Sequence, residues 1–138
     1  MNFWLCCVTQ DNLNVALEAG VIGFKEHVGK NLARAGIGDK LIFYVSREQF
    51  SSNIPVRKCF GIAVIKESLY ISSKRLWPNG LFPYRINIEV LSRNSARVET
   101  LIPNLSFIKN KKNWGSAFFP SVRQISPIDF ELISRSMG

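Results

Sequence analysis

The chain has 138 residues, of which 46% are apolar and 12% aromatic, so it can bury one core but is too short for two ordinary domains. We therefore expect a single domain over residues 1–138, and we exclude disorder for most of the chain because its apolar groups can offset the ordering entropy. No apolar run approaches the roughly 20 residues of a membrane-spanning helix, and the first residues lack the basic flank of a signal peptide. The sequence predicts a cytoplasmic protein without a membrane partner.

The positive charge is concentrated in one part of the chain. The formal net charge is +8, and residues 57–123 hold twelve lysines and arginines against three acids, whereas the remainder holds six basic residues and seven acids. A basic region of this kind attracts polyanions. The charge favours nucleic acid as a partner, and the alternative is a surface that merely keeps the protein soluble.

The expected elements are short strands separated by helices and long connections. A first strand over 3–8 is apolar on both faces, which indicates a central position in a sheet. Asp11 or Asn12 then caps a helix that ends at Gly20. The remaining expectations are, in chain order, an irregular segment over 21–27, a short helix over 29–35, a turn over 36–39, a strand over 40–45, a polar loop over 47–55, a strand over 59–65 with either a bulge or a close-packing site at Gly61, a long connection over 68–82, a strand over 84–91, a helical turn over 104–108, a short strand over 116–119 and a helix that begins at Ser126, Pro127 and Asp129.

These elements predict an α+β fold. Few of the strands are joined by tight two-residue turns, and long crossovers dominate, which favours an open mixed β-barrel of five or six strands with short helices at its edges. The strand over 84–91 alternates, with Ile86 and Ile88 on the buried face and Arg85 on the face that meets water.

The residues that enzymes use are scarce. There is one histidine, His27, and three cysteines, Cys6, Cys7 and Cys59, of which the adjacent pair points to opposite faces of a strand. A Cys–His nucleophile pair is conceivable, but no known signature surrounds it, and the clusters that hold metals are absent. We expect no enzymatic activity, no cofactor and no metal.

Two tryptophans lie beside cations in the basic region. Trp77 follows Lys74 and Arg75, and Trp114 follows Lys111 and Lys112. Aromatic rings beside cations are typical of proteins that stack bases and neutralise phosphates. Trp114 is therefore a candidate for stacking, and the alternative is that each tryptophan plugs an end of the barrel.

The sequence resembles the EVE domain, a PUA-like domain related to the YTH domain, over nearly its whole length. The matching segments are residues 3–9 (FWLCCVT), 38–44 (GDKLIFY), 77–78 (WP) with 82–85 (FPYR), 110–115 (NKKNWG) and 123–126 (RQIS) leading into 129–133 (DFELI). The resemblance implies a PUA-like barrel that takes a modified base, turned out of its strand, into an aromatic pocket.

Carried over by position, the implied base pocket consists of Trp77, Asn12, Ile22, Gly23 and Phe24. Ile22 stands where the family usually has a tryptophan, which keeps an apolar wall and loses its stacking. The candidates for phosphate contacts are Lys111, Lys112, Arg123 and Arg85. The expected partner is single-stranded or locally unpaired RNA or DNA with a modified base, because one stacked base hardly offsets its extrusion from a duplex.

Three other functions remain open from the sequence. One is a PUA-type RNA binder that reads shape and phosphates without selecting a modified base. Another is a hydrolase like the related ASCH domains, for which Gly29, Lys30 and Arg34 are a superficial match. The third is an accessory protein whose basic face docks a protein partner.

Overall fold

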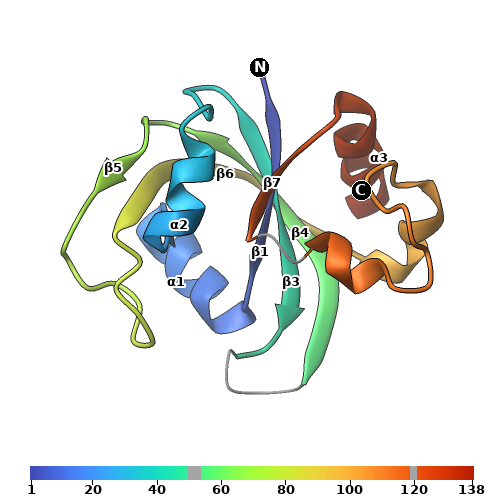
Figure 1. The fold of residues 1–138 in the computed structure, drawn as a ribbon, viewed down its shortest axis with the longest axis horizontal. Helices are drawn as coiled ribbons and strands as arrows, with labels where there is room; N and C mark the ends of the chain where they lie inside the picture. Colours follow the sequence, from blue (N-terminus) through green and yellow to red (C-terminus); the bar gives the residue numbers. More distant parts are fainter. Residues whose placement is uncertain (50–53, 119–120) are drawn as a thin grey trace.

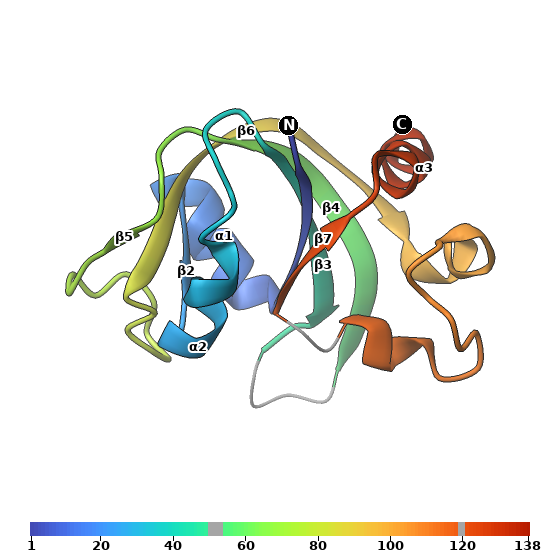
Figure 2. The ribbon, with the colours of Figure 1, turned by 45° about the horizontal axis from the view of Figure 1, so that its top comes forward.

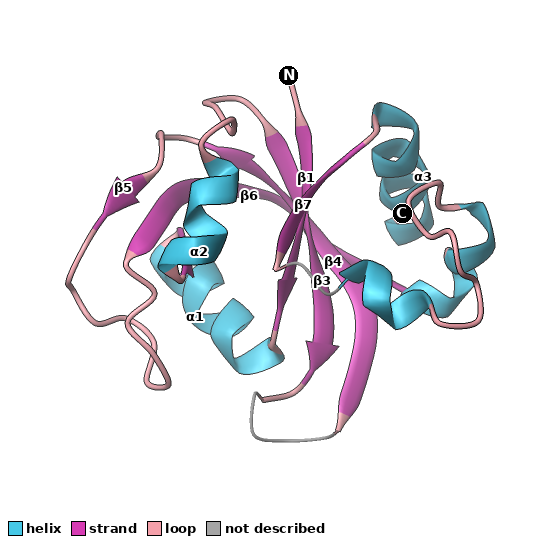
Figure 3. Ribbon diagram, in the orientation of Figure 1, coloured by secondary structure: helices cyan, strands magenta, loops and turns pink. Residues whose placement is uncertain are grey.

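A computed structural model describes residues 1–49, 54–118 and 121–138 and shows one curled sheet with helices on both of its sides (Figure 1). Its seven strands within the described residues confirm the predicted open mixed barrel, with a count slightly above the expected five or six. In chain order the elements are β1 (Phe3–Val8), α1 (Gln10–Ala19), β2 (Val21–Phe24), α2 (Glu26–Gly29), η1 (Lys30–Leu32), β3 (Lys40–Arg47), β4 (Pro55–Ile65), β5 (Tyr70–Ile71), β6 (Tyr84–Arg97), η2 (Val98–Thr100), η3 (Ile102–Asn104), η4 (Trp114–Phe118), β7 (Val122–Ile125) and α3 (Pro127–Met137), where η marks a 3₁₀ turn (Figure 3).

The strand order is β2-β6-β4-β3-β1-β7, with β5 added to β6. β1 pairs in parallel with β3 and antiparallel with β7, so it is internal to the sheet as its apolar sequence predicted. Parallel pairing means that β1 and β3 end at the same edge of the sheet. The ends of both strands at this shared edge line a cavity.

The sheet has a core on each face. One contains Trp4, Cys6 and Phe43 together with buried residues of α1 and β2. The other contains Leu5, Ile42 and Tyr44 with the apolar side of α3 and the 3₁₀ turns. Figure 2 shows the arrangement: α1, β2 and α2 lie on one side of the central strands, and α3 with the 3₁₀ turns lies on the other.

Capping hydrogen bonds mark the end of α1 and the start of α3. Gly20 adopts the left-handed conformation (φ 70°) that closes α1, and its N–H donates to the Ala16 carbonyl at 2.8 Å. The N-cap of α1 is Thr9, so the predicted caps Asp11 and Asn12 are wrong by two to three residues. At α3 the Ser126 hydroxyl accepts a hydrogen bond from the Asp129 N–H, as predicted.

Two local predictions are wrong because long-range pairing decides the structure. Residues 21–24 form strand β2, not an irregular segment, because β6 supplies its hydrogen-bond partners. The expected strand over 116–119 is a 3₁₀ turn as far as Phe118, with Phe119 outside the described residues, and the last strand lies at Val122–Ile125. The bulge at Gly61 is confirmed by its φ of 69° and a register shift between Phe60 and Ile62.

None of the helices in the described part of the chain has the length and apolar character needed to cross a membrane.

Candidate functional site

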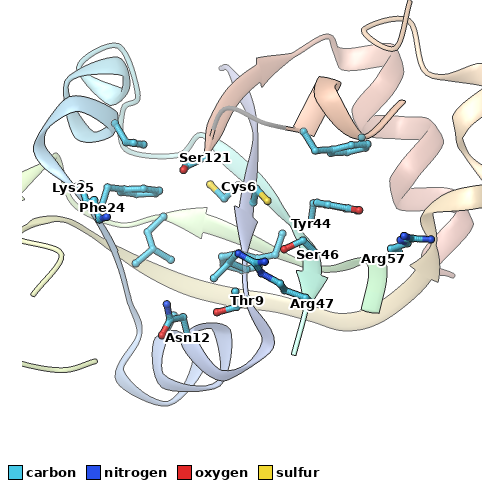
Figure 4. A pocket seen from close by; sticks show the side chains of 18 of the residues that line it. Cys6, Thr9, Asn12, Phe24, Lys25, Tyr44, Ser46, Arg47, Arg57 and Ser121 are labelled. Atoms are coloured by element: carbon cyan, nitrogen blue, oxygen red, sulfur yellow. The ribbon is translucent and has the colours of Figure 1, made fainter. Parts of the chain in front are cut away.

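A cavity of about 1000 Å³ opens at the edge where β1 and β3 end (Figure 4). Its walls come from the start of α1, from β2, from the ends of β1 and β3, from the start of β4 and from η4. Adjacent residues of β1 and β3 point to opposite faces of the sheet. The lining of this one cavity therefore has two parts, one formed by residues beside each core.

The first part, here called the Phe24 chamber, lies beside α1 and β2. Phe24, Ile22, Gly23 and Asn12 line it, so four of the five residues predicted for a base pocket lie together. Phe24 and Ile22 are only 7% and 4% exposed, and Asn12 is half-buried. The chamber thus combines two apolar walls with one amide that can donate and accept hydrogen bonds.

Trp77, the fifth predicted pocket residue, lies behind this wall and is not among the residues that line the cavity. It is 3% exposed, and its indole N–H donates to the Asn12 carbonyl at 3.1 Å. A Cβ on Gly23 would lie 2.7 Å from its ring, so Gly23 permits this close approach. Trp77 supports the chamber from outside and holds the start of α1 in place.

The prediction that Arg85 lies on the water-facing side of its strand is wrong. Its side chain is 2% exposed. The guanidinium donates to the carbonyls of Phe82, Lys74 and Leu81 and to the Ser72 hydroxyl, and it lies 5.4 Å from the Trp77 ring centroid. These acceptors belong to the long connection before β6, which the strand alternation alone does not reveal. Arg85 fastens this connection, and its donors are not available to a phosphate.

The second part, here called the Trp114 chamber, lies beside the other core. The Tyr44 and Phe118 rings stack with centroids 4.1 Å apart, and Trp114 meets Phe118 edge-on at 5.9 Å. The Arg57 guanidinium lies 5.9 Å from the centroid of the half-buried Trp114 ring. The predicted stacking candidate Trp114 therefore lines the same cavity as Phe24, with a cation beside it.

Of the predicted phosphate contacts Lys111, Lys112 and Arg123, one lines the cavity and two bond to backbone carbonyls. Lys112 lines the cavity. Lys111 instead donates from Nζ to the Leu105 carbonyl at 3.0 Å, and Arg123 donates to the Ala117 carbonyl at 2.7 Å and lies 4.6 Å from the Phe107 ring centroid. Lys111 and Arg123 thus fasten the segment that carries Trp114, and neither lines the cavity.

Three cations of the site were missed by the sequence analysis: Lys25, Arg47 and Arg57. Together with Lys112 they give the described lining of the cavity four lysines and arginines and no carboxylate. Arg47 and Arg57 flank a polar loop that shows no pattern of a binding site. Only the pairing of β3 with β4 brings them to one edge.

The cavity also contains thiols, and these do not have the properties of a nucleophile. Burial raises the pKa of the Cys6 thiol to about 12, and burial raises the pKa of Cys7 although the Ser46 hydroxyl and Arg47 act against it. Both thiols are therefore protonated at neutral pH, the opposite of an activated cysteine. His27 lies on the exposed helix α2 at the rim.

Within the described residues, no group of three or more histidine, cysteine or acidic side chains is arranged to hold a metal ion. The side chain of Lys30, which the hydrolase interpretation needs, lies outside the described residues.

The architecture is that of the YTH-type folds. It superimposes on the Pho92 YTH domain in complex with m6A with a TM-score of 0.69 at 11% identity, covering 99% of this chain and 84% of that one. A YTH domain of Zygosaccharomyces rouxii MRB1 in complex with N6-methyladenosine RNA gives a TM-score of 0.67 at 13% identity, covering 97% and 84%. These likenesses establish the fold.

Sequence similarity shows the family to which the chain belongs. The EVE domain family model matches residues 2–136. A UPF0310 protein of Pyrococcus abyssi is 33% identical over 138 residues, which cover 96% of this chain and 97% of that protein. The chain belongs to the EVE domain family, as the resemblance in its motifs predicted.

Proposed function

We propose that this protein binds single-stranded or locally unpaired nucleic acid and takes one base, carrying a modification, into the Phe24 chamber. The observation that carries the proposal is the make-up of the cavity: apolar and aromatic walls, the amides of Asn12, Asn79 and Asn113, and a rim of four cations without a carboxylate in its described lining. Aromatic walls accept the face of a base, an amide reads its edge, and cations neutralise the flanking phosphates. The two YTH domains of similar fold are complexes with m6A and with N6-methyladenosine RNA, which supports a modified base as the ligand.

The energetics favour an unpaired strand. Stacking of a base on an aromatic ring contributes roughly 1–3 kcal/mol, whereas extrusion from a duplex costs a few kcal/mol. The Ile22 wall contributes apolar contact without stacking, so a methyl group on the base adds about 0.8 kcal/mol. This corresponds to about fourfold discrimination between methylated and unmodified strands.

One observation favours a second candidate function, a single-strand binder without selectivity. Trp77 lies behind Gly23 and Ile22 replaces the family tryptophan, so two rings expected around the base do not line the chamber. Such a protein would bind modified and unmodified strands equally and with a strong dependence on salt. The two functions differ in base preference, and both are of binding rather than catalysis, in keeping with the protonated thiols of the cavity.

The test is the affinity for labelled single strands by fluorescence anisotropy at one fixed salt. The strands carry N6-methyladenosine, 5-methylcytosine, 5-hydroxymethylcytosine or the unmodified base at a central position, in RNA and in DNA. We expect saturable binding that prefers one modified strand, and a loss of about 5- to 100-fold in Phe24→Leu, which keeps apolar volume and removes stacking.

Phe60→Leu is the control, because Phe60 is a half-buried phenylalanine of β4 that does not line the cavity. Unchanged affinity of Phe24→Leu for every strand would show that the chamber is not the base pocket. Equal affinity for all strands in the wild type, lost in Phe24→Leu, would establish the unselective binder instead.

A further inference from the structure

Backbone strain is concentrated at the cavity. In the described part of the chain, Arg57 (φ 52°) and Phe82 (φ 47°) are the non-glycine residues with a positive φ, and both line the cavity. Arg57 lies in the Trp114 chamber and Phe82 in the Phe24 chamber. Such conformations cost of order 1–3 kcal/mol and persist at ligand sites, where they aim a side chain. Each chamber therefore contains one residue with a positive φ.

The strain at Arg57 has a specific geometric effect. Val45 pairs with Lys58 and Arg47 pairs with Pro55, so Ser46 alone faces the two residues Val56 and Arg57. This is a β-bulge, which re-aims the side chain of the bulged strand. The result is the position of the Arg57 guanidinium beside the Trp114 ring.

Trp114 is suited to receive a flat ring. It is half-buried, its edge is fixed against Phe118, and Phe118 is in turn stacked on the buried Tyr44. The ring lines the cavity, and the next residue, Gly115, is exposed and has no Cβ. A packed aromatic ring that lines a cavity with a cation beside it is an arrangement on which single-stranded bases stack.

From this geometry we infer that the Trp114 chamber is a second base-stacking subsite, which takes the nucleotide next to the one held in the Phe24 chamber. The inference rests on the proposed function of the Phe24 chamber. The linking phosphate lies over the end of β1 and β3, where Arg47 lines the cavity between the two chambers. The ligand is accordingly a stretch of at least two consecutive unpaired nucleotides, with their bases on opposite faces of the sheet.

The experiment couples a change in the protein to a change in the strand. Anisotropy titrations compare wild type with Trp114→Leu, which keeps apolar packing on Phe118 and removes the stacking surface. Each protein is titrated with strands in which the target nucleotide, its 5′ neighbour or its 3′ neighbour is abasic. We expect Trp114→Leu to bind the intact strand about 5- to 100-fold more weakly.

We also expect one abasic neighbour to weaken wild-type binding by a similar factor and to have little further effect in Trp114→Leu. Arg57→Gln should weaken the same strand, and Arg93→Gln, which removes an exposed charge outside the cavity, should not. Thermal unfolding of each variant checks that the fold is intact.

The two proposals fail in different ways. If neither abasic neighbour couples to Trp114→Leu while the abasic target still weakens binding, the second subsite is refuted and the Phe24 chamber stands. If the abasic target binds wild type as tightly as the intact strand, the Phe24 chamber itself is refuted. If one neighbour couples, that side also gives the direction in which the strand crosses the sheet edge.

Discussion

The connections that carry Trp77 and Trp114 share a sequence pattern, but their tryptophan rings lie in different environments. Both place cations directly before a tryptophan and a glycine shortly after it. In the first connection the ring is 3% exposed and lies behind the cavity wall, whereas in the second it is half-buried and lines the cavity.

The two rings differ in burial because different side chains donate hydrogen bonds to the two connections. Arg85 of β6 donates into the first connection and draws it against the core, and Gly23 lets Trp77 approach β2 closely. Arg123 and Lys111 fasten the second connection only at the carbonyls of Ala117 and Leu105. A tryptophan beside cations in the sequence therefore does not by itself indicate an accessible ring, because Trp77 is packed into the interior and Trp114 lines the cavity.

The largest expected effect is the difference in protein stability between alanine variants of Trp77 and Trp114. Trp77→Ala should lower the free energy of unfolding by about 3–5 kcal/mol, because it empties a fully packed site. Trp114→Ala should lower it by roughly 1–2 kcal/mol, since its ring is only partly buried. Urea unfolding measures both, and losses of equal size would mean that the two connections are packed alike.

The next largest effect on stability is expected from removal of the buried Arg85 guanidinium. Arg85→Met should destabilise the protein by about 3 kcal/mol, because buried carbonyls lose a charged donor. Arg93→Met, an exposed change on the same strand β6, should stay within about 0.5 kcal/mol.

Arg85→Lys distinguishes fastening from ligand contact. A single ammonium cannot replace the planar guanidinium at several acceptors, so this variant should recover only part of the lost stability. Weaker nucleic-acid binding by Arg85→Lys with full stability would instead restore Arg85 as a phosphate contact.

The smallest expected effect is on the stability of alanine variants at Gly23 and Gly115. Gly23→Ala should lower the free energy of unfolding by about 1–3 kcal/mol, because its Cβ meets the Trp77 ring at 2.7 Å and the Phe82 Cβ at 2.9 Å. Gly115→Ala meets nothing within 4 Å and should change stability by less than about 0.5 kcal/mol. Thermal unfolding compares the pair, and a neutral Gly23→Ala would show that Trp77 can move away from the wall.

Features that depend on neighbours in the chain could be predicted from the amino-acid sequence. The apolar strand β1 and the Ser126 cap of α3 were predicted correctly because a short apolar run and a helix cap are each formed by a few consecutive residues. The family motifs also located Asn12 and the segment of Ile22, Gly23 and Phe24, which the fold brings to one chamber.

The residues that surround this chamber are placed by contacts that appear only in the folded protein. The burial of Arg85 and Trp77 depends on carbonyls that the chain offers elsewhere, and β2 exists because β6 pairs with it. Arg57 reaches Trp114 because a bulge between β3 and β4 turns it there. Trp77 and β2 have partners at least 60 residues away, and Arg85 bonds to carbonyls of an irregular connection, so the alternation of a strand reveals neither arrangement.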